Sequence, residues 1–521
     1  MLIMVPAVIF KTYDQQQAML LPPDLNELID AHHPVRVINS VIDNLNIDKL
    51  LETYKGGGTS SHHPRMLLKV LVYAYVCNEY SSRRIEQLLR RDVQFMWLSA
   101  MATVDHNTIN RFRTQRLGKL LKDVFTQIVK LLVDSGHVSL KDVYVDGTKI
   151  EANASRYTFI WGNAIKTNKE NMATQLEALW EYAETVAAEE LKDKRPASFA
   201  PVNPEQVKHT IDQINEALAD KKVDKKVKQK LNYAKKNWPS NTAKYNAQEQ
   251  ILDGRNSYSK TDEDATFMRM KEDHMENGQL KPGYNIQITS ESQFVLNYTA
   301  HPNPTDTLTL ARHIEDFEQT LGSTPNTLTA DAGYGSEQNY ELLEQKGIEA
   351  YVKYNYFDQE QKGARNSFAT DQLHYNGDED YFVCPMGQHM CNIGTHKEKN
   401  RSGYNQTITR YQAQNCNGCP MRGMCHKQKA NRIVEVNHKL RKLKDQASTR
   451  LRSEEGIRRR KQRCCDVEPI FANWKQNKGF RRFMLRGKDK ICTEIGLLSI
   501  AHNLQKYSKT QKRGKTTAKA A

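Results

Sequence analysis

Two short apolar runs that each end in an aspartate constrain the fold of this chain most. Residues 143–145 lead into Asp146, and residues 328–330 lead into Asp331. Around the second run, strand-like segments alternate with helical patterns, which predicts a sheet with parallel strands covered by helices. In such sheets functional groups collect at the carboxyl ends of the strands, so we expect the two aspartates at one edge. The further strands are expected at 283–288, 294–298 and 349–354, and the helices at 305–321 and 337–346.

A third acid, Glu468, opens a helical pattern near the C-terminus. Apolar residues follow it with spacings of three and four residues, which predicts one buried stripe with Glu468 beside it. The helix can therefore pack on a sheet while Glu468 turns toward the strand ends. Two aspartates and a glutamate can share a pair of divalent cations, and Mg²⁺ or Mn²⁺ suits such oxygen ligands. Each acid taken alone could also have a structural role, as a turn residue or as a charge near the start of a helix. The stripe consists of Val467, Ile470, Phe471 and Trp474.

Positive charge is concentrated in the last fifth of the chain. Residues 426–521 hold 27 Lys and Arg against 8 Asp and Glu, an excess of 19 that exceeds the net charge of +15 of all 521 residues. A basic segment with interleaved aromatic residues indicates a nucleic-acid face, although it could instead be a solubilising surface. Met1–Phe10 and other apolar runs are far shorter than the about 20 residues of a membrane span, so no membrane partner is expected. Nine cysteines without a secretory signal favour a reducing cytoplasm.

Two further segments read as helical. Residues 1–135 carry several short helix starts with arginines near them, among them Arg111 and Arg113, which fits a helix-turn-helix DNA module or a plain helical bundle. Residues 156–277 are polar with a narrow amphipathic stripe, which predicts a helical insertion, or a solvated hairpin with no direct chemistry.

A cysteine cluster separates the strand region from the basic segment. A Cys-x-x-Cys pair with two further cysteines predicts a structural zinc site, with unligated thiols as the alternative. The expected ligands are Cys384, Cys416, Cys419 and Cys425, with Cys391, His389 and His426 in reserve.

From about Leu21 to Lys506 the chain resembles a bacterial insertion-sequence DDE transposase with an RNase H-like catalytic core. Short motifs in the family's order carry this resemblance, and their number makes it specific. They are His33-Pro34, Ser81-Ser82-Arg83, Asp105-His106-Asn107-Thr108-Ile109, residues 145–153, 260–265, 281–285 and 330–334, Val467-Glu468-Pro469-Ile470-Phe471, Arg481-Arg482-Phe483 and Arg486-Gly487.

The resemblance implies that Asp146, Asp331 and Glu468 bind two Mg²⁺ ions and catalyse DNA cleavage and strand transfer. It also implies a phosphate-binding lysine at Lys475. The family places an arginine four residues before the glutamate, where this chain has Cys464, so Arg463 or Arg460 must replace it. The other basic residues expected on DNA are Arg481, Arg482, Arg486, Arg111 and Arg113.

The expected partners are double-stranded DNA, both as terminal inverted repeats and as target, and a second copy of the chain in a homodimer. The expected location is the bacterial cytoplasm, at the nucleoid. Two rivals remain: a catalytically inactive, transposase-derived DNA-binding protein, and an RNase H-like nuclease without strand transfer. The expected fold is mixed α/β, with an RNase H-like mixed sheet and flanking helices. Its segments are an all-α N-terminal DNA-binding domain at 1–135, core parts at 136–155, 278–360 and 441–507, a helical insertion at 156–277, a Cys-rich insertion at 361–440 and a disordered basic tail at 508–521.

Overall fold

The computed structural model describes residues 24–54, 61–270, 278–363, 366–400 and 403–520. Two compact units divide the chain. The first comprises residues 1–112 with 507–521, and the second comprises residues 113–506. The apolar start at 1–10 lies outside the described residues. Within the described ranges, none of the helices has the length and apolar character needed to cross a membrane.

The first unit is helical, as the sequence predicts. Asp105 caps the last of its six N-terminal helices by accepting hydrogen bonds from the backbone amides of Asn107 and Thr108. The unit ends at Phe112 rather than near residue 135, because the next long helix, α7 (Leu121–Asp134), packs within the second unit. The six helices are α1 (Pro34–Asp43), α2 (Asp48–Leu51), α3 (Pro64–Val76), α4 (Ser82–Leu88), α5 (Val93–Leu98) and α6 (His106–Arg111).

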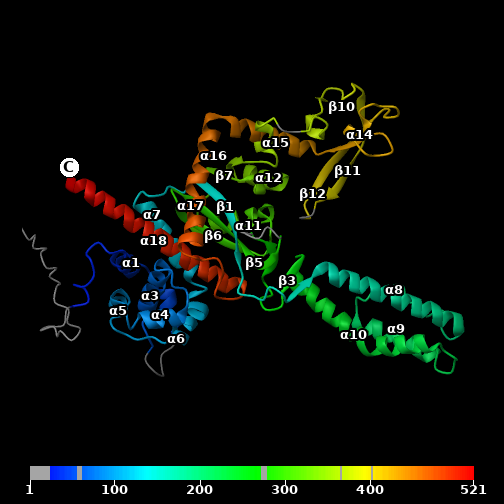
Figure 1. Ribbon diagram of the computed structural model, residues 1–521, viewed down its shortest axis with the longest axis horizontal. Helices are drawn as coiled ribbons and strands as arrows, with labels where there is room; N and C mark the ends of the chain where they lie inside the picture. Colours follow the sequence, from blue (N-terminus) through cyan, green and yellow to red (C-terminus); the bar gives the residue numbers. More distant parts are fainter. Residues whose placement is uncertain (1–23, 55–60, 271–277, 364–365, 401–402, 521) are drawn as a thin grey trace, which may run out of the picture. The chain divides into compact units, whose positions relative to one another are not determined.

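A six-stranded mixed sheet forms the centre of the second unit (Figure 1). Its order is β4-β5-β1-β7-β8, and β6 also pairs with β5. β1 runs antiparallel to β5 but parallel to β7, and β7 runs parallel to β8. The predicted parallel strands are thus present within a mixed α/β fold. The strands are β1 (Asp142–Glu151), β4 (Thr266–Arg269), β5 (Leu280–Glu291), β6 (Phe294–His301), β7 (Thr327–Ala330) and β8 (Glu349–Val352).

Helices cover this sheet. On α7, the Lys122 ammonium donates hydrogen bonds to Asn297 and Asp316, and the Phe125 ring lies 5.0 Å from that of Tyr298 on β6. These contacts explain why α7 belongs to the sheet and not to the N-terminal unit. The connecting helices are η2 (Asp306–Leu308), α11 (Leu310–Leu321), η3 (Ala332–Tyr334), α12 (Glu337–Gln345) and α13 (Phe357–Gln361).

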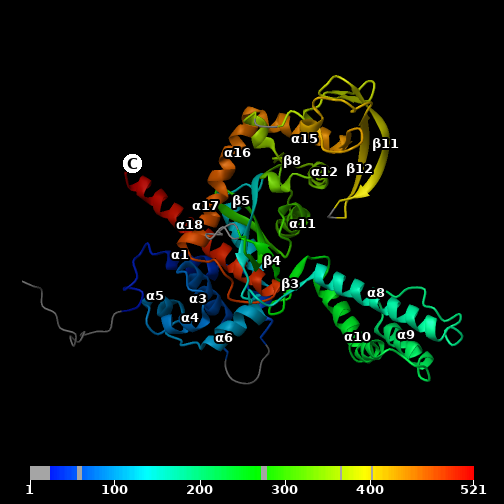
Figure 2. The same cartoon turned by 45° about the vertical axis from the view of Figure 1, so that its right-hand side comes forward.

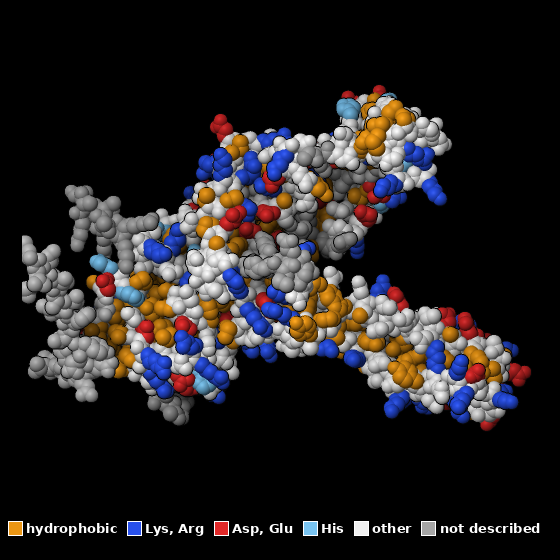
Figure 3. All heavy atoms as spheres, viewed as in Figure 1, with side chains coloured by type: hydrophobic (Ala, Val, Ile, Leu, Met, Phe, Trp, Pro, Cys, Tyr) orange, Lys and Arg blue, Asp and Glu red, His pale blue; other side chains and the backbone are white. Residues whose placement is uncertain are grey.

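The insertion forms a three-helix arm, residues 162–252, that is joined to the sheet through the short pair β2 (Phe159–Trp161) and β3 (Ser257–Ser259). The predicted apolar stripe of its middle helix is buried against Trp180 and Trp238 of the flanking helices. Both ribbon views draw the three helices packed alongside one another (Figures 1 and 2). Acidic and basic side chains are interspersed over the arm (Figure 3). The helices are α8 (Gly162–Val186), α9 (Pro204–Ala217) and α10 (Lys225–Leu252).

The Cys-rich segment forms a five-stranded antiparallel sheet of order β13-β12-β11-β10-β9. Its core is small and centres on Phe382 and Tyr411. The strands are β9 (Tyr375–Asn376), β10 (Tyr381–Val383), β11 (His389–Lys399), β12 (Asn405–Ala413) and β13 (Ile433–Val436), with the short helix α14 (Arg422–Cys425).

The basic C-terminal segment is helical. The predicted stripe after Glu468 is buried, and Val467, Ile470 and Trp474 are fully inaccessible. The tail predicted to be disordered from residue 508 instead continues the last helix to Ala520. The elements are α15 (His438–Arg452), α16 (Glu454–Asp466), α17 (Glu468–Ala472), the π-helical turn η5 (Asn473–Asn477) and α18 (Lys488–Ala520).

Candidate active site

The register of β1 and β7 places Asp146 and Asp331 side by side. The last printed pair of these parallel strands is Tyr144 with Thr329, and each aspartate lies two residues further on. Neighbouring strands are about 4.8 Å apart, and residues in register point to the same face. The two carboxylates therefore lie close together, but only Asp331 follows a strand end. Asp146 lies within β1, where it pairs with Ile288 of β5, so the prediction that it ends a strand is wrong. The Asp146 side chain is 11% exposed.

Helix α16 is fixed on the sheet at both ends. Near its start, the Arg459 guanidinium donates to Thr327 Oγ1 at 2.5 Å and pairs with Asp142 at 3.0 Å, at the beginning of β7 and β1. At its end, the buried Asp466 accepts a hydrogen bond of 2.6 Å from the Ser290 hydroxyl on β5. Burial raises the pKa of Asp466, while its hydrogen bonds from the Ser290 hydroxyl and the Gln293 amide lower it. The helix therefore lies along β1 toward the acidic edge.

Arg463 connects the third acid to the first. It lies one turn after Arg459 and so shares its face of α16. Its Nη1 is 3.2 Å from Asp146 Oδ2, and its Nη2 is 3.7 Å from Glu468 Oε1. Glu468, the first residue of α17, is 57% exposed at its side chain. One guanidinium group thus stands between the two carboxylates and compensates their charge.

Asp306 is a fourth acid at this edge, which the sequence analysis missed. Its Oδ1 accepts hydrogen bonds from Asn285 Nδ2 at 2.7 Å and from Gln287 Nε2 at 2.9 Å on β5. A Cβ at Gly147 would stand 2.6 Å from Asp306 Oδ1, and one at Gly333 would stand 3.2 Å from Oδ2. Asp306 is therefore packed against the residues that follow Asp146 and Asp331. Asp306 is the first residue of η2, a few residues after β6. The sequence analysis interpreted this segment only as the start of a helix.

Tyr334 closes the base of the site. It is fully buried, and its hydroxyl donates to Gln287 Oε1. Burial raises the pKa of Tyr334 well above its ordinary value, and the negative charges of Asp306, Asp146 and Asp331 raise it further. The hydroxyl therefore stays protonated and acts as a hydrogen-bond donor.

The acid set fits a divalent cation in its chemistry, because Asp146, Asp331 and Glu468 offer only carboxylate oxygens, which Mg²⁺ prefers. Among the described residues, however, no group of three or more His, Cys, Asp or Glu side chains is placed to hold a metal ion as it stands. Arg463 occupies the space between Asp146 and Glu468 and holds them on opposite sides of its guanidinium group. Cation binding would require this side chain to give way.

Of the two arginines expected near Glu468, Arg463 lies beside the acids, whereas Arg460 packs over the Phe357 ring at 5.1 Å. Lys475 is only 8% exposed and lies in the π-helical turn η5. Lys475 lies seven residues after Glu468, a spacing that would put both on one face of a regular α-helix, and the π-helical turn breaks this spacing. The burial argues against an accessible phosphate contact at Lys475 in this conformation.

The remaining basic residues differ in exposure. Arg482 donates to the carbonyl oxygens of Ala152 and Ala154, and Arg486 donates to that of Asn153, so both fasten the loop after β1. Arg481 and Arg111 are exposed, whereas Arg113 is only 3% exposed. Arg113 lies in the π-helical segment Phe112–Leu117, and its predicted contact with DNA stays a prediction.

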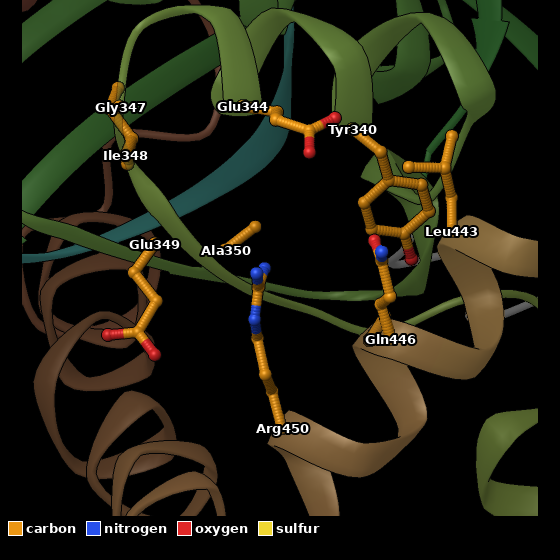
Figure 4. A pocket seen from close by; sticks show the side chains of 10 residues that line it. Tyr340, Glu344, Gly347, Ile348, Glu349, Ala350, Leu443, Gln446 and Arg450 are labelled. Carbon is orange, nitrogen blue, oxygen red and sulfur yellow. The ribbon is translucent and has the colours of Figure 1, made fainter.

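A pocket of about 250 Å³ lies away from the acids, between α12, β8 and α15. Arg450 reaches into it from α15, with Glu344 and Glu349 at its sides (Figure 4). Glu349 begins β8, so this pocket opens at the end of the parallel strands opposite Asp331. It therefore contributes nothing to the acidic edge.

The fold and this edge define a mixed α/β protein with carboxylates gathered along two adjacent strands. Residues 383–508 match the family model described as Transposase DDE domain, and residues 23–115 match the model described as Transposase domain (DUF772). Over these two segments the chain is therefore similar to transposases. No curated protein and no solved structure matches it.

These matches imply DNA transposition, and therefore DNA binding, as the activity of the chain. The matched DDE segment contains Glu468 and the cysteine cluster but neither Asp146 nor Asp331. The assignment of the two aspartates therefore depends on their strand geometry.

Proposed function

We propose that the protein cleaves DNA at the terminal inverted repeats of an insertion sequence and joins the released ends to target DNA, with Asp146, Asp331 and Glu468 as its catalytic acids. The observation that carries this proposal is the alignment of Asp146 with Asp331, with Arg463 linking Asp146 to Glu468. We assign the central sheet to the RNase H-like core expected from the sequence.

The three acids would hold two Mg²⁺ or Mn²⁺ ions. Such a pair activates the attacking water or 3′-hydroxyl and stabilises the leaving oxygen in an in-line displacement at phosphorus. Residues of the chain hold the three acids in place. Arg459 and Asp466 fix α16, so the start of α17 and Glu468 remain beside the strand ends.

Arg463 compensates the acids before a cation binds. Ions bound by the acids would supply this compensation instead, and the Arg463 guanidinium group would then be able to form two parallel hydrogen bonds to a DNA phosphate. Arg463 would thus have two roles in turn, first pairing with the acids and then binding the DNA phosphate expected from the sequence.

The basic C-terminal segment supports DNA as the substrate. Its excess of 19 positive charges would release counterions on binding, so affinity should fall steeply with salt. Because transposition joins two ends of one element, we propose that a homodimer carries out the reaction.

The test is a cleavage assay on duplexes that carry the two ends of the element. Asp146→Asn, Asp331→Asn and Glu468→Gln should each abolish Mg²⁺-dependent nicking while end binding persists. Asp358→Asn is the matched control, because Asp358 is an exposed acid that pairs with Lys353 just beyond β8. Full activity in any of the three variants would remove that residue from the site.

Two further assays separate the rivals. Wild-type protein that binds the ends but never cleaves them with Mg²⁺ would be the inactive DNA-binding protein. Cleavage without joining of precleaved ends to target DNA would identify a nuclease without strand transfer.

A further inference from the structure

The four predicted zinc ligands line one small cavity in the Cys-rich domain. The cavity has a volume of about 20 Å³, enough for one particle of the size of a water molecule. Three different turns bring the cysteines to it, although up to 41 positions separate them in sequence. The walls include Cys384, Cys416, Cys419, Cys425 and His426.

Two of these turns resemble each other. In the first, the Gln388 amide donates to Cys384 Sγ at 3.3 Å, and Gly387 has a φ of +79°. In the second, the Cys416–Cys419 turn, Gly418 has a φ of +69°. Here the donor to Cys416 Sγ is the amide of Arg432, at 3.4 Å, which lies outside the turn just before β13. Each of these two sulfurs thus accepts a hydrogen bond from a backbone amide.

Arg432 supplies the second observation. It is 7% exposed, and its Nη1 lies 2.9 Å from Cys425 Sγ. In the part of the chain that the structure describes, no carboxylate pairs with this guanidinium group. A buried cation without a counter-charge is costly, so a negatively charged metal–sulfur cluster beside Arg432 would be favoured.

His426 supplies the third observation. Both of its ring nitrogens are buried and have no hydrogen-bond partner among the described residues. The imidazole lines the same cavity as the four sulfurs. A thiolate drawn inward by a metal ion would accept a hydrogen bond from this ring.

We propose that Cys384, Cys416, Cys419 and Cys425 bind one structural Zn²⁺ ion as thiolates. The four thiols release their protons to solvent on binding, and the resulting cluster carries a net charge of −2. Arg432 neutralises part of this charge, and His426 donates a hydrogen bond to one sulfur. The sulfurs must move inward by a small distance, since no formed metal site is present among the described residues.

The ion would stabilise a domain whose hydrophobic core is small. The main cluster of buried side chains in this domain contains eight residues. Small domains with so little buried area need a metal or another cross-link for stability. The cysteines tie the β10–β11 turn to the segment between β12 and β13, which closes one end of the sheet.

The test begins with the full-length protein, purified under reducing conditions and measured by elemental analysis. One zinc per chain is expected. The serine variant of each of the four cysteines should lower the zinc content, whereas Cys391→Ser and His426→Gln should keep it. Cys391 is a matched control because it is exposed on β11 and does not line the cavity.

Cobalt substitution tests the ligand set in the wild-type chain and does not depend on the folding of any variant. Four sulfur ligands give stronger thiolate charge-transfer absorption than three sulfurs with one nitrogen. A Cys₄ spectrum supports the proposal. A protein that holds neither zinc nor cobalt, or a Cys384→Ser variant that keeps a full zinc content, would overturn it. A three-sulfur spectrum together with zinc loss in His426→Gln would overturn the Cys₄ assignment.

Discussion

Arg463 offers the sharpest test of the acidic edge, because the structure gives it two carboxylate partners with different exposure. Its contact with Asp146 spans 3.2 Å between side chains that are 12% and 11% exposed. Its contact with Glu468 spans 3.7 Å, and that carboxylate is 57% exposed. We therefore expect the two pairs to contribute unequally to stability.

The magnitudes follow from the distances. At 3.2 Å and an effective dielectric constant of about 20, the attraction to Asp146 is about 5 kcal/mol before desolvation is subtracted. Breaking a buried pair by removal of one partner costs about 3–5 kcal/mol, so we expect Arg463→Gln to cost about 3 kcal/mol. The pair with Glu468 should contribute less than about 1 kcal/mol, because solvent screens it.

The assay is a double-mutant cycle by urea denaturation in EDTA. Arg463→Gln combined with Asp146→Asn should show a coupling energy of about 2 kcal/mol, whereas the combination with Glu468→Gln should show less than about 1 kcal/mol. Arg460→Gln is the matched control, since Arg460 lies on the same helix but packs over Phe357. Its coupling to Asp146 should be close to zero.

Magnesium adds a second readout. A cation that binds the folded acids stabilises them by mass action, so Mg²⁺ should shrink the stability deficit of Arg463→Gln. The reasoning is refuted if Arg463→Gln destabilises the wild-type and Asp146→Asn backgrounds equally, or if Mg²⁺ leaves the deficit unchanged.

Three further predictions concern the surroundings of the acids. Gly147→Ala should lower cleavage at least tenfold, because the new methyl group would clash with Gln287 Nε2. Gly136→Ala, whose methyl group would meet open space, should leave cleavage unchanged although its φ, unlike that of Gly147, is positive; equal cleavage by both variants would contradict this. Asp306→Ala should lower the cleavage rate while Asp306→Asn, which keeps the Oδ1 acceptor, restores most of it; failure of the Asn variant would show that charge rather than position matters. Burial lowers the pKa of His301 from 6.5 to about 4. The unfolded chain therefore binds this proton first, stability is lost as pH falls from about 6.5 toward about 4, and His301→Gln should flatten this part of the pH–stability curve by up to about 3 kcal/mol; an unchanged curve would contradict the assignment.

The strand–helix order and the meeting of Asp146 with Asp331 could be predicted from the sequence. An apolar run that ends in an acid is a local pattern, and parallel pairing converts two such patterns into neighbours. The buried stripe after Glu468 was equally local, and the structure confirms it.

Three features of the site could not be predicted from the sequence, because they depend on tertiary contacts or on local helix geometry. The choice between Arg463 and Arg460 depends on which face of α16 meets β1, and Arg459 and Asp466 fix that face from outside the motif. Asp306 was missed because its partners Asn285 and Gln287 lie on another strand. The burial of Lys475 follows from a π-helical turn, for which the sequence pattern carries no signal.

Iron-mediated backbone cleavage tests the central claim most directly. Fe²⁺ replaces Mg²⁺ in oxygen-ligand sites and, with ascorbate and peroxide, cuts the polypeptide next to the bound ion. The account predicts three cuts, near Asp146, Asp331 and Glu468, that excess Mg²⁺ suppresses together. Cuts at only one of these segments, or at sites far from all three, would show that the acids do not share a metal centre.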